Sequence, residues 1–182
     1  MSNFVLLTGI LLFCLFFWAV KFHFASERLP TGMVFVSLAS VINIAVFAYV
    51  IVRQGQSTLL LAPSLLLQAA SGTLFLWAFS VTRDASLKLA FDSAPPGDVI
   101  RKGPYRYVRH PFYLAYILFW LGCAVATLHP LNVVLFLVLT LAYMIAAVRE
   151  KRAFLSSNHR ANYAAYREAT RFRWTSVRRE NQ

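Results

Sequence analysis

The stretch Gly103–Tyr113, which reads GPYRYVRHPFY, concentrates side chains that can bind charged groups. Its eleven residues include three Arg or His side chains, three tyrosines and two prolines, and they separate a polar segment from a strongly apolar run. An arginine grips a carboxylate or phosphate with two parallel hydrogen bonds. Tyr105, Tyr107 and Tyr113 either attract a cationic ligand to their ring faces or belong to the aromatic belt of a membrane interface. This combination of side chains is typical of the entrance to an active site.

Pro111 indicates that a helix begins inside this stretch, because proline is common at the first helical position. The backbone amides at the start of that helix would attract an anion, next to Arg106 and Arg109. The alternative is that these arginines extend to the phosphates of lipids. Both interpretations stay open for Arg106, whereas we favour ligand binding for Arg109.

Glu150 is the only acidic residue between Asp98 and Glu168, and it stands at the end of a long apolar run. Its carboxylate either pairs with the basic side chains beside it in the sequence or holds an amine, hydroxyl or cation of a ligand near Arg109. The sequence leaves both possibilities open. No CxxC or HExxH motif is present, and no metal site is predicted.

The elements that position these residues are predicted to be membrane-spanning helices. Of the 182 residues, 59% are hydrophobic and 14% are charged, which indicates an all-α integral membrane protein. Crossing the bilayer takes about 20 apolar residues. Five runs approach or exceed this length: Phe4–Phe22, Met33–Val52, Leu59–Val81, Phe112–Leu128 and Leu131–Val148. His129-Pro130 predicts a tight hairpin between the last two, and Asn43 and Gln68 are expected to join helices.

The Lys and Arg residues predict how these spans are oriented. Two of them lie between Lys21, at the end of the first span, and Thr31; one follows the second span, six lie between the third and fourth, and nine follow the fifth. All but one therefore share a side, which the positive-inside rule assigns to the cytoplasm, with the N-terminus outside. The net charge of +11 is explained by this asymmetry and by attraction to anionic lipids, so no nucleic-acid partner is expected.

The chain is predicted to form one membrane domain. Residues 1–82 form three N-terminal spans, 83–111 a cytoplasmic loop, 112–148 the helical hairpin and 149–182 a cytoplasmic tail. Apolar and aromatic residues of the tail recur at helical spacing, with Tyr163 and Tyr166 on one face, so the last span is expected to continue or bend into an amphipathic helix.

The GPYRYVRHPFY stretch resembles the signature of the isoprenylcysteine carboxyl methyltransferase family, which is related to phospholipid N-methyltransferases. The similarity covers about residues 97–174, where Leu155, Tyr163 and Tyr166 match a leucine and paired tyrosines of the family. Adjacent glutamates are usual before that leucine, but an ungapped match places Lys151 at one of these positions, beside Glu150. Either the helix is slipped by one residue and Glu150 serves, or the acidic role is lost.

The resemblance implies methyl transfer from S-adenosylmethionine at the cytoplasmic membrane face. Independently of the resemblance, no cleavable signal or organelle address is evident in the sequence, which favours a bacterial-type inner membrane. The acceptor would be lipophilic or membrane-partitioned: a prenylcysteine-type carboxylate, a lipid amine or a small thiol. Arg109 and Glu150 would be the catalytic residues. The cofactor would be bound by Gly97, Asp98, Val99, Ile100, Tyr105, His110, Pro111, Phe112, Tyr113 and Glu150.

Two other functions stay open from the sequence. A membrane module without enzymatic activity could use its basic tail to bind lipid or a partner, and a membrane reductase could share the C-terminal architecture. The oligomeric state is not predicted.

Overall fold

A computed structural model describes residues 2–22, 30–54, 58–83, 91, 99–157 and 160–180. These residues form six α-helices and one short 3-10 helix, and no strand occurs among them. The α-helices are α1 (Ser2–Phe22), α2 (Thr31–Gln54), α3 (Thr58–Thr82), α4 (Pro111–Thr127), α5 (Pro130–Ser156) and α6 (Arg160–Glu180), and the 3-10 helix is η1 (Gly103–Arg106).

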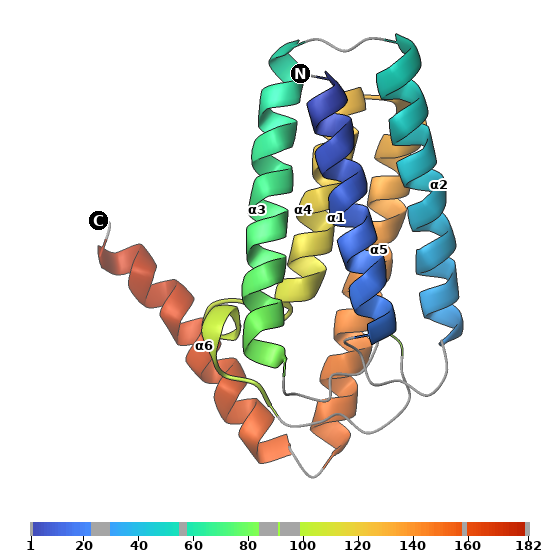
Figure 1. Ribbon diagram of the computed structural model, residues 1–182. Coiled ribbons are helices and arrows are strands. Elements are labelled where there is room, and N and C mark those ends of the chain that lie inside the picture. The colour runs from blue at the N-terminus through green and yellow to red at the C-terminus, as the bar shows by residue number, and fades with distance from the viewer. Residues whose placement is uncertain are drawn as a thin grey trace.

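Five of the helices stand side by side in an elongated bundle, while α6 runs obliquely outside it (Figure 1). Within the described residues, α1, α2, α3 and α5 are long and apolar enough to cross a membrane. The prediction of an all-α membrane protein is therefore confirmed. The remaining expected span, α4, is an apolar helix of 17 residues, so a fifth crossing stays a prediction.

Prolines set the starts of the last two bundle helices. Pro111 and Pro130 occupy the first positions of α4 and α5, where the missing amide hydrogen costs no helical hydrogen bond. Leu128 ends α4 in the left-handed conformation, with φ at +46°, and the His129 ring accepts a hydrogen bond from the Leu131 amide. The predicted hairpin is confirmed.

Polar side chains join the apolar helices at membrane depth. The Asn132 amide of α5 donates to the Asn43 side-chain oxygen of α2 at 2.6 Å, and Thr8 of α1 donates to Gln68 of α3. The expected joining role of Asn43 and Gln68 is thus confirmed. Hydrogen bonds of this kind satisfy groups that lipid cannot pair.

The most extensive packing is between α3 and α4, which lie side by side in the bundle. Ser71 donates to the Ala115 carbonyl at 2.7 Å. A Cβ added to Gly122 would lie 3.3 Å from the Ser64 carbonyl, so only a very small residue fits there without displacement. Small residues allow helix backbones to approach in this way.

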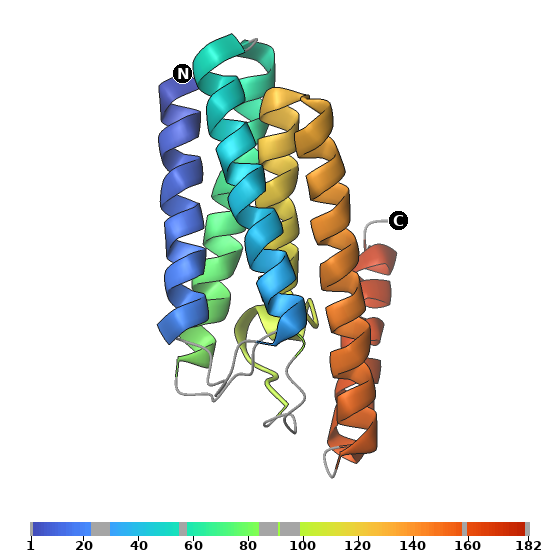
Figure 2. The same ribbon diagram turned by 90° about the vertical axis from the view of Figure 1, so that its right-hand side faces the viewer.

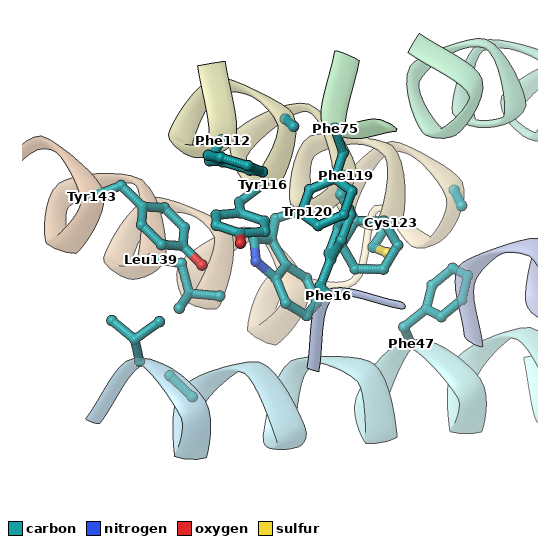
Figure 3. Close-up of a cluster of buried hydrophobic side chains, with 14 of the residues drawn as sticks. Phe16, Phe47, Phe75, Phe112, Tyr116, Phe119, Trp120, Cys123, Leu139 and Tyr143 are labelled. Atoms are coloured by element: carbon teal, nitrogen blue, oxygen red, sulfur yellow. The ribbon is translucent and has the colours of Figure 1, made fainter. Parts of the chain in front are cut away.

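An aromatic cluster fixes α1 against these two helices (Figure 3). The buried ring of Phe16 lies 4.7 Å from Phe75 of α3, 5.0 Å from Tyr116 and 5.3 Å from Phe119 of α4, measured between centroids. The edge-to-face arrangement of the two α4 contacts is a favourable one for aromatic pairs. The N-terminal helix is therefore anchored to the start of the C-terminal half of the bundle.

The tail forms a separate helix. In Figure 2, α5 extends beyond the other bundle helices and α6 turns back along it. The chain leaves helical geometry at Ser157, whose backbone is extended, and becomes helical again at Arg160. The tail was expected either to continue the last span as one helix or to bend away from it, and the structure shows the second arrangement.

Candidate active site

The motif is held against the end of α3. Gly103 has a φ of +54°, a conformation that favours glycine, and an added Cβ would lie 2.7 Å from a methyl group of Val81. Pro104 is buried, and its carbonyl accepts hydrogen bonds from the amides of Tyr107 and Val108. This compact turn leads directly into the start of α4.

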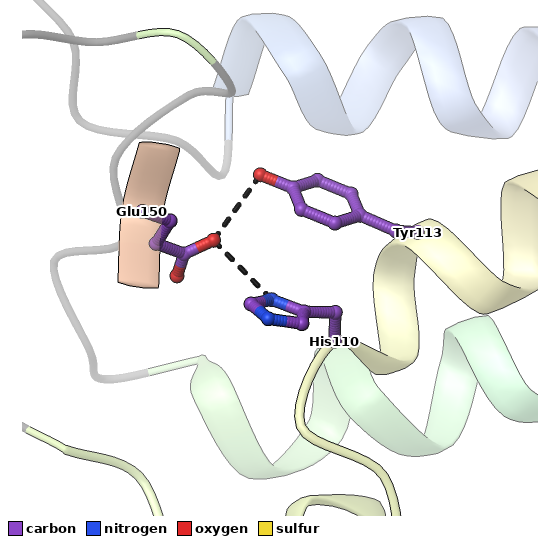
Figure 4. A network of polar contacts seen from close by, with 3 residues as sticks. All are labelled: His110, Tyr113 and Glu150. Carbon is purple, nitrogen blue, oxygen red and sulfur yellow. Dashed lines mark hydrogen bonds and ion pairs between the residues drawn. The ribbon is translucent and has the colours of Figure 1, made fainter. Parts of the chain in front are cut away.

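Glu150 meets the motif at that point (Figure 4). One oxygen of its carboxylate, Oε2, lies 3.3 Å from Nδ1 of His110 and accepts a hydrogen bond from the Tyr113 hydroxyl, also at 3.3 Å. The rings of His110 and Tyr113 are stacked, with centroids 5.4 Å apart and planes 12° apart. Residues about 40 positions apart in the sequence thus share one acidic centre.

The orientation of α5 distinguishes Glu150 from its neighbour. Tyr143 lies two helical turns before Glu150, and both side chains line the same cavity. Lys151 is exposed on another face. The interruption after Ser156 separates the register of α5 from that of α6, so an ungapped count back from the α6 tyrosines does not identify the residue that faces the motif.

The α6 helix covers the other side of the motif. The Tyr166 hydroxyl donates to the Tyr105 carbonyl at 2.8 Å. Arg109 donates to the Arg167 carbonyl at 3.3 Å, and Arg101 donates to the Asn162 carbonyl at 2.7 Å. Both of the tyrosines expected on one face, Tyr163 and Tyr166, are buried, and Tyr163 stacks on Phe154 of α5 with centroids 4.7 Å apart.

The tyrosines of this region are kept neutral by their surroundings. Burial raises the pKa of Tyr105 well above its ordinary value, and the nearby Glu150 carboxylate raises it further. Burial likewise raises the pKa of Tyr166 to about 12. Both hydroxyls therefore keep their protons at alkaline pH values where an ordinary tyrosine would lose its own, and the bond from Tyr166 to the Tyr105 carbonyl requires the proton of Tyr166.

A cavity opens at the acidic centre and continues between α1, α2, α4 and α5. Its polar mouth is formed by Tyr105, Arg109, His110, Tyr113 and Glu150. Its body is lined by Phe13, Phe16, Phe17, Val20, Met33, Val36, Ser37, Ser40, Pro111, Phe112, Tyr116, Trp120 and Tyr143. The cavity thus joins a charged entrance to an interior that is largely apolar, an arrangement suited to an amphiphilic ligand.

The N-terminal helices contribute lining residues that the sequence analysis did not single out. On α1 these are Phe13, Phe16, Phe17 and Val20, and on α2 they are Met33, Val36, Ser37 and Ser40. Each set has the spacing i, i+3, i+4, i+7, which marks one face of a helix. This spacing is visible in the sequence, but both helices are apolar all round, so the sequence does not reveal which of their faces borders a cavity.

The predicted site residues fall into three groups. The structure brings Tyr105, Arg109, His110, Tyr113 and Glu150 together at the mouth, and Pro111 and Phe112 line the cavity behind them. Val99 and Ile100 are half-buried but are not among the described lining residues. Gly97 and Asp98 lie outside the described residues. Among the side chains that the structure describes, no group of acidic, His or Cys residues could hold a metal ion.

A model of the phospholipid methyltransferase family matches residues 58–161, which is more than half of the chain. No curated protein and no solved structure matches it. The matched region runs from α3 through the motif and Glu150 to the start of α6, and so includes the residues that form the polar mouth. The resemblance noted for the motif is confirmed, and the chain belongs to the phospholipid methyltransferase family.

Proposed function

We propose that this protein transfers a methyl group from S-adenosylmethionine to an amphiphilic acceptor in the membrane. The observation that carries the proposal is the contact of Glu150 with His110 and Tyr113 at the mouth of a largely apolar cavity. Membership in a methyltransferase family supports the reaction class. The cavity supports an acceptor that has an apolar chain.

The donor set at the mouth fits this cofactor. S-Adenosylmethionine carries an amino group, ribose hydroxyls, a carboxylate and a positive sulfur, and when bound it supplies an electrophilic methyl group. Glu150 can accept hydrogen bonds from the amino group or hydroxyls, and the ring of Tyr105 can face the positive sulfur. The backbone of residues 97–100 is part of the proposed binding site.

Arg109 is proposed to orient the acceptor. The residue as a whole is half-buried and lines the mouth, and one of its guanidinium nitrogens donates to the Arg167 carbonyl at 3.3 Å. A guanidinium fixed in this way can hold a carboxylate or phosphate of the acceptor, and the attraction is stronger at a partly dry site than in water. Placing the acceptor atom in line with the methyl group is the main contribution a protein makes to such a reaction.

The body of the cavity is proposed to take the apolar part of the acceptor. Phe17 of α1 lines the cavity but is 58% exposed on a helix expected to face lipid. A chain could therefore enter sideways between helices, while the cofactor enters from the side that carries most of the basic residues. By the positive-inside rule, that side is proposed to be the cytoplasm.

Methyl transfer in vesicles tests the proposal. Purified protein is given S-adenosylmethionine with a labelled methyl group, in separate vesicles that contain phosphatidylethanolamine, a prenylcysteine or an alkyl thiol. We expect label in one of these acceptors and a loss of at least about 100-fold in Arg109→Ala, because removing a positioning group has effects of this order. Arg152→Ala, a change at an exposed arginine of α5, should keep full activity. Absence of label from all three acceptors would contradict the proposal.

A further inference from the structure

One buried hydroxyl that lines the cavity has no hydrogen-bond partner among the described residues. Tyr116 of α4 is 8% exposed and lines the cavity. Its hydroxyl has no hydrogen-bond partner among the residues that the structure describes. A buried hydroxyl without a partner costs free energy, so native proteins rarely leave one unused.

The neighbouring tyrosine shows the opposite situation. Tyr143 of α5 lines the same cavity and is equally buried, but the polar side chains of Trp120 and Ser40 lie next to its hydroxyl. In Figure 3 the hydroxyls of Tyr116 and Tyr143 both turn toward the space next to α2. The cavity therefore contains one hydroxyl that is used within the protein and one that is available to a ligand.

Tyr116 lies a short distance inside the cavity, close to the mouth where the reacting end of a bound molecule would be. Tyr113, at the mouth, and Tyr116 are three residues apart on α4, which places them on the same side of the helix, about 4.5 Å apart along its axis. A molecule that reaches from the mouth into the cavity body passes Tyr116 within a few bonds of its polar end.

We propose that the Tyr116 hydroxyl donates a hydrogen bond to an uncharged oxygen of the acceptor, such as an amide or ester carbonyl, a few bonds behind the methyl-accepting atom. The inference rests on the proposed function for the identity of the occupant. It adds that the acceptor is not a polar head on a plain hydrocarbon chain. An acceptor without this oxygen would leave Tyr116 unpaired, and sites built to pair a polar group discriminate by this means.

A pair of ligands that differ only at this position tests the inference without any methyl transfer. N-(2-aminoethyl)dodecanamide carries an amide carbonyl behind its amine, and pentadecan-1-amine has a chain of the same length without it. Dissociation constants for both are measured by calorimetry in one detergent, with wild type, Tyr116→Phe and Tyr49→Phe. Tyr49 is the matched control, because it is a tyrosine of α2 that is 61% exposed. Differences in detergent partitioning cancel when each ligand is compared between proteins.

We expect Tyr116→Phe to weaken binding of the amide about 5- to 10-fold, as the loss of one hydrogen bond does, and to leave binding of the alkylamine unchanged. Tyr49→Phe should change neither. An equal effect on both ligands, no effect on either, or no binding of either by wild type would overturn the inference. If the protein discriminates between the two ligands but transfers no methyl group, the role inferred for Tyr116 stands and the proposed function is wrong.

Stability without ligand provides a second readout. Tyr116→Phe removes an unpaired hydroxyl, so its thermal midpoint should equal or exceed that of wild type. Tyr143→Phe removes a hydroxyl that lies next to the polar side chains of Trp120 and Ser40, so its midpoint should fall. A lower midpoint for Tyr116→Phe would show that its hydroxyl already has a partner in the protein, and would overturn the inference.

Discussion

At the scale of single residues, Glu150 connects the two halves of the candidate site. Its carboxylate contacts His110 and Tyr113, whereas the sequence left open a pairing with the basic residues on either side of it. The side chain keeps 42% of its surface exposed, so it remains accessible to a ligand at the mouth. A carboxylate that is held in position and still accessible is suited to binding a cationic or hydroxyl group.

Replacing Glu150 by Gln tests this role. Glutamine keeps the size of the side chain but loses the charge that assists hydrogen bonds to an amine or hydroxyl. We expect the KM for S-adenosylmethionine to rise about 10-fold or more, because a charge-assisted hydrogen bond is roughly twice as strong as a neutral one. Lys151→Gln, which changes the exposed neighbour, should leave this KM unaltered. Equal values in Glu150→Gln and wild type would rule out a binding role for the carboxylate.

The raised pKa of the Tyr166 hydroxyl predicts that the packing of α6 weakens at alkaline pH. Its pKa is raised from 10.0 to about 12 in the folded protein, so folding favours the protonated form. The stabilisation is therefore complete below about pH 10 and is lost as the pH rises through about 12. We expect α6 to become sensitive to proteases over this range, because a tyrosinate cannot donate to the Tyr105 carbonyl.

Tyr166→Phe is the control for this pH effect. It should make α6 more sensitive at neutral pH and reduce the further change between pH 10 and 12. If the variant and wild type respond identically to alkali, Tyr166 is not the group that titrates.

At the scale of helices, the sequence predicts those features that depend on local chemistry. Pro111 and Pro130 mark the starts of α4 and α5, and the spacing of Tyr163 and Tyr166 identifies the buried face of α6. The sequence did not predict whether α5 and α6 are interrupted, because no proline or glycine lies between Arg149 and Arg160. The orientation of Glu150 depends on how α5 packs in the bundle, so it needed the three-dimensional structure.

The cavity-lining faces of α1 and α2 were missed for a related reason. In a soluble protein, polar residues mark the outer face of a helix, but here lipid-facing and cavity-facing positions are both apolar. Phe16 lines the cavity, whereas Phe4 is exposed and does not line it, yet the two residues are identical in type. Only the packing of the bundle distinguishes them.

The contact between α2 and α5 predicts a measurable contribution to stability. Asn132 donates to both the side-chain oxygen and the carbonyl of Asn43, at 2.6 and 3.1 Å, and accepts from Thr127. We expect Asn132→Ala to lower the free energy of unfolding by about 1–2 kcal/mol, since it leaves buried polar groups without a partner. Denaturation in mixed micelles measures the change. The matched variant Asn162→Ala, at an exposed position of α6, should differ from wild type by much less, and equal losses in the two variants would contradict the role given to Asn132.

At the scale of the whole molecule, the distribution of charge and the length of α4 make a prediction about topology. If α4 crosses the membrane in addition to the other four candidate spans, the number of crossings is odd and the termini lie on opposite sides. Seventeen of the 18 basic residues then share the side of the candidate site. The positive-inside rule assigns that side to the cytoplasm.

Fusions of a reporter that is active only in the cytoplasm test the topology. We expect activity for a fusion at the C-terminus and none for a fusion at the N-terminus. A third fusion, within the connection between α2 and α3, should be inactive, because the end of α2 and the start of α3 lie at the far end of the bundle from the site. Activity at both termini would show an even number of crossings, and α4 would then not span the membrane.

The measurement that tests the central claim most directly is a calorimetric titration of the purified protein with S-adenosylhomocysteine, the product form of the proposed cofactor. It requires no knowledge of the acceptor and depends on the mouth formed by the motif and Glu150. We predict saturable binding to wild type that is strongly weakened in Glu150→Gln and unchanged in Lys151→Gln. No binding to wild type above background would contradict the proposed function.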